Sequence, residues 1–431
     1  MADADRADGG NAVQRVLEGV KVVEVSAWAF VPSAGAALGE WGADVVKVEP
    51  PTGDPIRGLV SAGVGPMDGI VFPWELWNRG KRGIALDLTQ PEAQEIVLRL
   101  CEDADVFLTS YLAPVREKLG IDLDAVRARN PQIIYACGNG QGARGPEAAK
   151  GGYDSITYWS RGGVSASVTP AGYPWPVGMP AGAFGDSTSG MALAGGIAAA
   201  LVKKARTGEG SLVDVSLLGA AMWSMQMAAV GAAVKMASSP EMAEMIEHPP
   251  PPPVAPGALP PPPVFNPLVN CYETSDHRWV ALCMLQPDVY FDGVVRVLGR
   301  DDLVDDPRFA TPDARAEHMP ELVDELANAF KTLTLDEARA ALSAQRGQWD
   351  VVNRAVDLLR DPQAQENGFV QQVDYDGGRT LPMFTTPVQF ERTPPVLTPA
   401  PTFAGDTDEI LGSIGMDEES SLPAKISGAV I

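Results

Sequence analysis

Two short stretches near the start of the chain decide the fold: Gly19-Val-Lys-Val-Val-Glu-Val25 and Asp44-Val-Val-Lys-Val-Glu49. Runs this rich in valine predict strands, and the Ala/Gly-rich segment between them, Ser33 to Gly42, predicts a helix. A strand, a helix and a strand at this spacing form a βαβ unit, so the two strands should pair in parallel. Further strands are predicted at Gly83–Leu88, Asp105–Thr109, Gln132–Cys137 and Ser211–Leu218. This alternation predicts a doubly wound α/β fold.

The character of the chain changes after about residue 220. An Ala-rich helical stretch carries several methionines, which fill cores and also line adaptable apolar sites. Ten of the fifteen residues from Pro249 to Pro263 are proline, which predicts extended polyproline. Beyond this segment, Cys271 to Leu282 predicts two strands around a polar turn, and Asp406 to Gly415 predicts a final short helix.

The bulk composition excludes several classes of function. The 431 residues carry a net charge of −23, which argues against a nucleic-acid partner, because phosphate binding needs a basic surface. The four cysteines and three histidines show no metal-ligand spacing, so we expect no metal. The acidic residues 1–16 lack an apolar signal-peptide core and predict a disordered tail. We find no segment that would span a membrane and expect a cytoplasmic protein.

One carboxylate, Asp186, stands where a Gly/Pro/Ala loop from Gly178 meets an apolar run. The run from Met191 to Val202 has no polar residue, so as a helix it should be buried on all sides. Two interpretations of Asp186 are open. It could cap this helix, since Asp is a preferred N-cap, or it could be a poorly solvated nucleophile, and the two roles can coexist.

A cation cluster and a glycine-rich loop are candidates for binding an anion. The turn Trp77-Asn-Arg-Gly-Lys81-Arg82 places three cations in four residues, and Lys118 is a further candidate. The alternative is a solvated surface turn. The loop from Gly138 to Gly145 follows a predicted strand, as a ligand-binding loop would, but it lacks the Lys-Ser/Thr of a P-loop.

Taken in order, several motifs resemble the class III CoA-transferases, the family of formyl-CoA, carnitine and bile-acid CoA-transferases and of α-methylacyl-CoA racemase. The resemblance runs from about residue 17 to 415. Its motifs include Gly42-Ala-Asp-Val-Val-Lys-Val-Glu-Pro-Pro, Gly53-Asp-Pro, Asn78-Arg-Gly-Lys-Arg-Gly-Ile-Ala-Leu-Asp-Leu, Gly151-Gly-Tyr-Asp, Gly185-Asp-Ser, Asp305-Asp-Pro-Arg-Phe and Thr407-Asp-Glu-Ile-Leu.

The resemblance implies a large Rossmann-like domain with a parallel sheet, from residues 17–220 and 346–431, and a smaller α+β domain from residues 221–345. It also implies an interlocked-ring homodimer. Asp186 falls on the catalytic nucleophile, with Gly185, Tyr153, Asp154 and Gln141 as oxyanion donors or site support. The residues expected to bind coenzyme A, as substrate, are Ser26, Ala27, Asn78, Arg79, Lys81, Arg82, Lys118 and Asn139.

The implied chemistry moves CoA from an acyl-CoA donor to a carboxylic acid acceptor through a covalent aspartyl intermediate. The methionine-rich stretch favours a bulky apolar acyl group. The chain departs from the family at Pro50, where a basic residue is frequent, and it has no counterpart of the glycine-rich loop of formyl-CoA transferase. The alternative is a 2-methylacyl-CoA racemase, but Tyr153 stands where the racemases carry histidine. A non-enzymatic scaffold that displays the polyproline segment is the third hypothesis.

Overall fold

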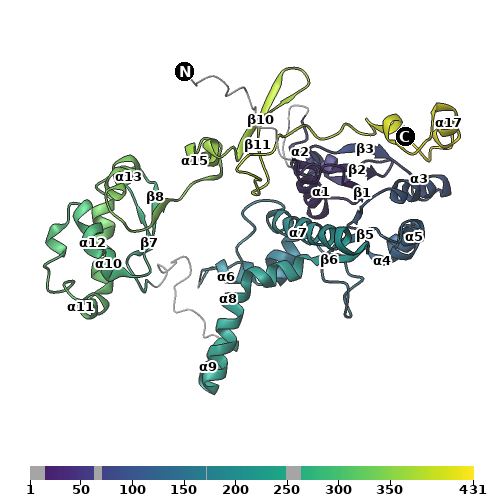
Figure 1. The fold of residues 1–431 in the computed structure, drawn as a ribbon. Helices are drawn as coiled ribbons and strands as arrows, with labels where there is room; N and C mark the ends of the chain where they lie inside the picture. The colour runs from purple at the N-terminus through teal and green to yellow at the C-terminus, as the bar shows by residue number, and fades with distance from the viewer. Residues whose placement is uncertain (1–14, 63–69, 171, 249–263) are drawn as a thin grey trace, which may run out of the picture. The chain divides into compact units, whose positions relative to one another are not determined.

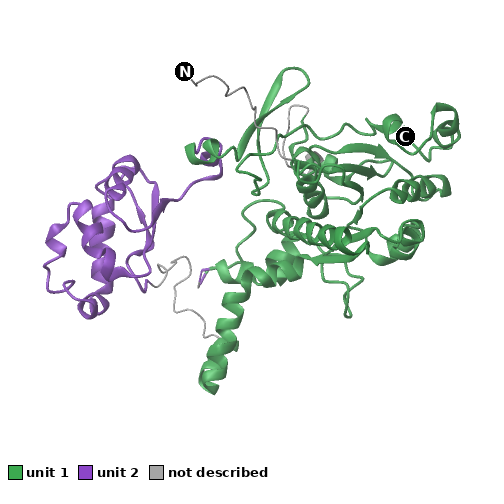
Figure 2. Cartoon of the chain, in the orientation of Figure 1, with its two compact units in different colours: residues 1–169, 173–253, 362–431 green, residues 170–172, 254–361 purple. Residues whose placement is uncertain are grey.

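The computed structural model describes residues 15–62, 70–170, 172–248 and 264–431 (Figure 1). The chain divides into two compact units (Figure 2), with residues 1–169, 173–253 and 362–431 in unit 1 and residues 170–172 and 254–361 in unit 2. Most of the predicted acidic tail and the whole polyproline segment lie outside the described residues, so both stay predictions.

Unit 1 is built on a six-stranded parallel sheet with the order β3-β2-β1-β4-β5-β6. In the centre, Val23 of β1 lies opposite Val46 of β2 on one side and Phe107 of β4 on the other. This order reverses direction between β1 and β4 and confirms the predicted doubly wound α/β fold. The strands are β1 Lys21–Val25, β2 Asp44–Glu49, β3 Arg82–Ala85, β4 Val106–Thr109, β5 Ile134–Asn139 and β6 Leu212–Ser216.

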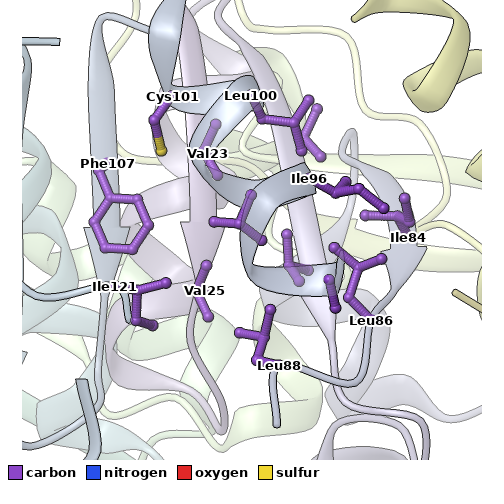
Figure 3. Close-up of a cluster of buried hydrophobic side chains, with 14 of the residues drawn as sticks. Val23, Val25, Ile84, Leu86, Leu88, Ile96, Leu100, Cys101, Phe107 and Ile121 are labelled. Carbon is purple, nitrogen blue, oxygen red and sulfur yellow. The ribbon is translucent and has the colours of Figure 1, made fainter. Parts of the chain in front are cut away.

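Each face of the sheet is buried under its own helices, because alternate strand residues point to opposite sides. Val23 and Phe107 pack with Ile96 and Leu100 of α3 (Pro91–Glu102) in one hydrophobic cluster, which Figure 3 shows in close-up. On the other face, strand residues pack against α1 (Phe30–Glu40) and α7 (Phe184–Thr207).

The remaining elements of unit 1 connect or flank this sandwich. The end of the chain also adds to it, since Val430 forms an antiparallel bridge with Leu86. The remaining elements are η1 Pro55–Ala62, α2 Phe72–Asn78, α4 Ala113–Lys118, α5 Leu123–Arg129, η2 Ser155–Arg161, α6 Val164–Val168, α8 Leu217–Ser238, α9 Pro240–Glu247, α15 Pro362–Glu366, β10 Val370–Tyr375, β11 Arg379–Phe384, α16 Thr407–Ser413 and α17 Glu418–Ile426.

Unit 2 is a three-stranded antiparallel sheet, β7-β8-β9, packed against helices. Its core stacks Tyr272 on Phe330 at 5.0 Å between ring centroids. The elements are β7 Val269–Glu273, β8 Trp279–Cys283, α10 Pro287–Val297, η3 Asp301–Leu303, α11 Pro312–Glu317, α12 Met319–Phe330, α13 Leu335–Ser343, β9 Trp349–Val351 and α14 Ala355–Leu358.

The boundaries of the small domain differ from the predicted residues 221–345. The segment after residue 345 belongs to unit 2, because β9 pairs with β8 and places Trp349 opposite Leu282. Helices α8 and α9 group with unit 1, because α8 packs on η2 and on the end of β6. The α+β character of the small unit is as expected.

One prediction about an apolar helix is wrong for the single chain. The run in α7 is not buried on all sides, because Leu193 and Ile197 are buried whereas Ala192 and Val202 are exposed. Among the residues that the structure describes, one helix, α8, is long and apolar enough to cross a membrane by length and composition, with a mean hydropathy of 1.5. Only 11% of its apolar window is buried, and one such helix is weak evidence for a membrane span.

Candidate active site

Asp186 lies in the first turn of α7, and its neighbour Asp154 provides the cap of that helix. The Oδ2 atom of Asp154 accepts hydrogen bonds from the backbone N–H groups of Gly185, at 2.8 Å, and Asp186, at 3.4 Å. Ala183, at the N-cap position, is left-handed with φ of 59° and offers no capping side chain. The interpretation of Asp186 as the helix cap is therefore wrong, and its carboxylate is free for another role.

Gly185 is required by the close approach of the two segments that meet here. A Cβ atom at this position would lie 2.3 Å from the Tyr158 ring and 2.6 Å from Oδ1 of Asp154. Any larger residue would push α7 away from Asp154 and uncap the helix. The Gly185 N–H donates to Asp154, so it is not free to bind an oxyanion in this structure, and the role of Gly185 that the geometry shows is site support.

The carboxylate of Asp186 lines a cavity of about 420 Å³ and shares it with aromatic and glycine residues. Burial, and then the neighbouring Asp154, raise the pKa of Asp186 from its usual 3.8 to about 7. Within the described chain, Oδ1 of Asp154 is buried without a hydrogen-bond partner, and burial raises the pKa of this residue too. Asp186 is thus a basic, poorly solvated carboxylate, which favours nucleophilic attack over passive structure.

The cavity lies at the carboxyl ends of β1, β4 and β5, where the strand order reverses. Its walls come from the segments that follow these strands, and crevices at such switch points are the usual ligand sites of doubly wound sheets. The lining residues are Ala27, Trp28, Phe30, Ser110, Leu112, Gly138, Asn139, Gly140, Gly151, Gly152, Tyr153, Ile156, Asp186 and Leu217. Tyr153, with 57% of its surface exposed, meets the Trp28 ring edge-on at 5.7 Å between centroids.

The polar residues of the glycine-rich loop are occupied by internal hydrogen bonds. The amide of Asn139 donates to Asp214 at 3.2 Å and its oxygen accepts from the Gly142 N–H at 2.6 Å. Gln141 donates to Thr157 at 3.2 Å and accepts from Arg161 at 2.7 Å. Asn139 lines the cavity, but the hydrogen bonds of Asn139 and Gln141 hold the loop in its conformation.

The cation cluster is an internal ion-pair network rather than a free phosphate clamp. Lys81 Nζ lies 2.8 Å from Oε2 of Glu24, and both side chains are 0% exposed. Burial lowers the pKa of Lys81 to about 8 despite this partner. Burial opposes ionisation of Glu24, but Lys81 and Lys47 lower its pKa below the usual value. The charge of Lys81 is thus already compensated inside the fold, and the expected contact of Lys81 with CoA gains no support from this geometry.

The other residues expected to bind coenzyme A are either buried or accessible. Ser26 and Asn78 are buried beside the same network, where Ser26 donates to Glu24 at 2.7 Å and Asn78 accepts from Lys81 at 3.0 Å. Arg79 pairs with Glu40, and Arg82 pairs with Asp44 and Glu409. Ala27 and Asn139, on the cavity wall, and Lys118, exposed in the last turn of α4, are accessible to a ligand.

A second crevice, of about 110 Å³, opens at the carboxyl ends of β1, β2 and β3. Tyr111 lines it, while the flanking residues Ser110 and Leu112 line the Asp186 cavity. Consecutive residues of one segment thus line both hollows. Leu119, the neighbour of Lys118, completes the wall of the second crevice together with Val25, Val48, Glu49, Pro50, Pro51, Leu86, Asp87, Leu88 and Thr89.

The sequence analysis missed Trp28 and the buried network of Glu24, Lys47 and Asp54. A signal for the network was present, since Lys47 and Glu24 interrupt valine runs in strands buried on both faces. A charge in such a strand needs a charged partner. No group of three or more His, Cys, Asp or Glu side chains in the described parts of the chain is arranged to hold a metal.

A doubly wound α/β sheet with a poorly solvated carboxylate in a pocket at its switch point is the arrangement of an α/β protein that binds its ligand at this edge of the sheet. Comparison with known proteins gives the family: residues 17–407 match the model of CoA-transferase family III. The chain belongs to this family and is a CoA-transferase by homology, as the resemblance predicted.

Relatives of known name span nearly the whole chain. (R)-2-Hydroxy-4-methylpentanoate CoA-transferase from Clostridioides difficile is 35% identical over 407 residues, which cover 94% of this chain and 96% of that protein. Cinnamoyl-CoA:phenyllactate CoA-transferase from Clostridium sporogenes is 29% identical over 410 residues, covering 94% of each. A solved structure, a CAIB/BAIF family protein from Brucella suis, has a TM-score of 0.74 at 28% identity, covering 92% of this chain and 99% of that one.

Proposed function

We propose that the chain transfers CoA between an acyl-CoA and a free carboxylic acid with Asp186 as the covalent nucleophile. The observation that carries this proposal is the Asp186 carboxylate itself, which faces a ligand-sized cavity and has a pKa raised to about 7. Within the described chain, neither oxygen of this carboxylate accepts a hydrogen bond. Capping of the helix by Asp154 releases it for chemistry.

The transfer proceeds through four acyl substitutions that need no net proton. The Asp186 carboxylate attacks the donor thioester, which gives a mixed anhydride and CoA thiolate. The thiolate then attacks the aspartyl carbonyl, which releases the donor acid and leaves an aspartyl-CoA thioester. The acceptor carboxylate attacks that thioester and forms a second anhydride, and the returning thiolate attacks the acceptor carbonyl. The products are acceptor-CoA and free Asp186, and the thioester energy is conserved.

Two groups on the cavity wall suit the charge that develops at the attacked carbonyl. The Asp186 oxygens lie beside the first turn of α7, where the helix dipole favours negative charge. The Tyr153 hydroxyl, on the same wall, is our candidate for an oxyanion donor in place of the Gly185 N–H.

We place coenzyme A along the carboxyl edge of the sheet. The second crevice would hold its nucleotide end, with exposed Lys118 beside the phosphates, and the reactive thioester would reach Asp186 past Ser110 to Leu112. A basic residue at the edge of a crevice in a chain of net charge −23 would attract a polyanion locally.

The acceptor we propose is an acid with a bulky apolar side chain, and specifically a 2-hydroxy acid. The cavity offers Trp28, Phe30, Leu112, Ile156 and Leu217 to such a side chain. The two relatives described above are named for 2-hydroxy-4-methylpentanoate and phenyllactate, which fit this description.

A CoA-exchange assay tests the proposal. Purified protein is given an acyl-CoA and either 2-hydroxy-4-methylpentanoate, phenyllactate or oxalate, and new CoA thioesters are separated by chromatography. We expect transfer to the two apolar acids, little to oxalate, and none by Asp186→Asn. Transfer by Asp186→Asn at the wild-type rate would exclude Asp186 as nucleophile.

We further propose a cytoplasmic homodimer, the state that the family resemblance implies. Its support is the apolar surface of α8, where Met222, Trp223 and Met227 are 62%, 74% and 86% exposed in the single chain. A second copy would cover these side chains, because large exposed apolar patches mark surfaces that bind another molecule. Light scattering without detergent should give twice the mass of the chain at nanomolar to micromolar concentration. A folded monomer, or a need for detergent, would contradict this.

A further inference from the structure

Trp28, three residues beyond the end of β1, has a backbone conformation that L-residues rarely adopt. Its φ is +70°, in the left-handed region. This conformation is unfavourable for a non-glycine residue and persists only where surrounding contacts enforce it.

Three hydrogen bonds hold the turn in this conformation. The Trp28 N–H donates to Oδ1 of Asp54 at 3.2 Å, and the Ala27 N–H donates to Oγ of Ser110 at 2.9 Å. The carbonyl oxygen of Ser26 accepts from Lys47 Nζ at 2.8 Å. Every residue from Ser26 to Trp28 is therefore tied to another part of the fold.

The buried ion network fixes these partners in turn. Lys47 Nζ lies 3.1 Å from Oδ2 of Asp54 and 3.1 Å from Oε1 of Glu24, and all three side chains are 0% exposed. Removing one member would leave a buried charge without its partner, at a cost of several kcal/mol. The network thus positions Trp28 as well as stabilising the sheet.

The indole of Trp28 separates the Asp186 cavity from an apolar cluster. On one side it lines the cavity and meets Tyr153 nearly perpendicular, at 87° between ring planes. On the other side it packs against the cluster of Ala29, Ile56 and Trp74, which is almost wholly buried. Without the indole, the cavity would extend onto this cluster.

We infer that Trp28 is a specificity-determining residue, whose fixed indole closes the acyl end of the Asp186 cavity and sets the largest side chain that fits. The inference rests on the proposed function, since it assigns the acyl group to this cavity. The wild-type cavity would take branched aliphatic and single-ring side chains and reject fused rings. The buried network holds the backbone of the turn, and contacts with Tyr153 and the apolar cluster hold the indole, so both oppose its displacement by a larger substrate.

Replacement of Trp28 by Gly opens the wall without adding strain, because glycine adopts φ of +70° at no steric cost. The acceptors are 4-methylpentanoate and 3-(2-naphthyl)propanoate, and the readout is the ratio of their kcat/KM values, which is independent of the amount of active enzyme. We expect Trp28→Gly to raise the ratio of kcat/KM for the naphthyl acid to kcat/KM for the branched acid by about tenfold or more. Burial of a few additional carbon atoms supplies a difference of this size. Trp28→Phe, which keeps an aromatic wall, should stay near the wild-type ratio.

A binding measurement separates this inference from the catalytic proposal. The S-alkyl CoA thioethers that carry the same two side chains cannot react, so their calorimetric affinities report the fit alone. The affinity ratio should shift in the same direction in Trp28→Gly, even if Asp186 were not the nucleophile. A ratio within twofold of wild type, an equal loss for both ligands, or no binding of either thioether would overturn the inference.

Discussion

The negative charge of Asp154 raises the pKa of Asp186, so removal of that charge should lower the pH midpoint of activity by a measurable amount. The pKa of Asp186 is raised to about 7 from 3.8, with burial as the larger cause and Asp154 as the second. Since the carboxylate is the nucleophile, kcat/KM should rise with pH and level off above about 7. Asp154→Asn keeps a side-chain oxygen to cap α7 but removes the negative charge. The midpoint should therefore fall by about one pH unit, or ~1.4 kcal/mol.

At pH 6 the effect is large enough to measure directly. A carboxyl with a pKa near 7 is about one-tenth ionised there, and one with a pKa near 6 is about half ionised. Asp154→Asn should thus retain about fivefold more of its own plateau activity at pH 6 than wild type does.

The assay is the rate of CoA exchange from pH 5 to 9, with an acyl-pantetheine donor as a check, since pantetheine carries no phosphate that titrates. Asp122→Asn is a matched control, because Asp122 caps α5 through the N–H groups of Asp124 and Ala125. Its midpoint should stay at the wild-type value. A flat wild-type profile, or an unmoved midpoint in Asp154→Asn, would refute the reasoning.

Three further predictions follow from the same groups. Asp186→Asn should raise the melting temperature at pH 8 but not at pH 4. A carboxyl whose pKa is raised by folding, here from 3.8 to about 7, opposes folding increasingly as pH rises from about 4 to 7, by roughly 4 kcal/mol in all. Equal melting temperatures of variant and wild type at both pH values would disprove it. Lys81→Met should lower the free energy of unfolding by about 3–5 kcal/mol, because Glu24 loses one of its buried partners. Lys118→Met should leave the melting temperature unchanged and raise KM for acyl-CoA. The reverse pattern would restore Lys81 as the phosphate ligand. Finally, a 2-methylacyl-CoA in deuterium oxide should gain no deuterium at the α-carbon, because Tyr153 stands where the racemases carry their histidine. Rapid labelling would show racemase chemistry.

The sheet and the position of Asp186 could be predicted because they depend on local patterns. The valine runs fix the strands, and the Gly-Asp pair before an apolar run marks the start of α7. The partners of charged side chains could not be predicted in this way. Lys81 pairs with Glu24, 57 positions earlier in the chain, and only the folded sheet brings them together. For this reason a buried ion pair was interpreted as a phosphate clamp.

Three other errors have similar physical causes. The end of unit 2 was placed too early because β9 has only three residues, too few for an alternating pattern to appear. Trp28 was overlooked because its role depends on a backbone angle and on a hydrogen bond to Asp54, neither of which leaves a mark in the sequence. The cap of α7 came from Asp154, 32 positions away from Asp186, so local sequence favoured the wrong aspartate.

The most direct test of the central claim follows oxygen atoms into Asp186. In the proposed mechanism, the acceptor acid forms an anhydride with Asp186, and the final attack by thiolate on the acceptor carbonyl leaves one acceptor oxygen on the aspartate. Turnover with an acid labelled with ¹⁸O in its carboxylate should therefore place ¹⁸O on the peptide that contains Asp186, and fragmentation should locate it on that side chain. The label should be absent without acyl-CoA. Sustained CoA exchange with no ¹⁸O on Asp186 would contradict covalent catalysis by this residue.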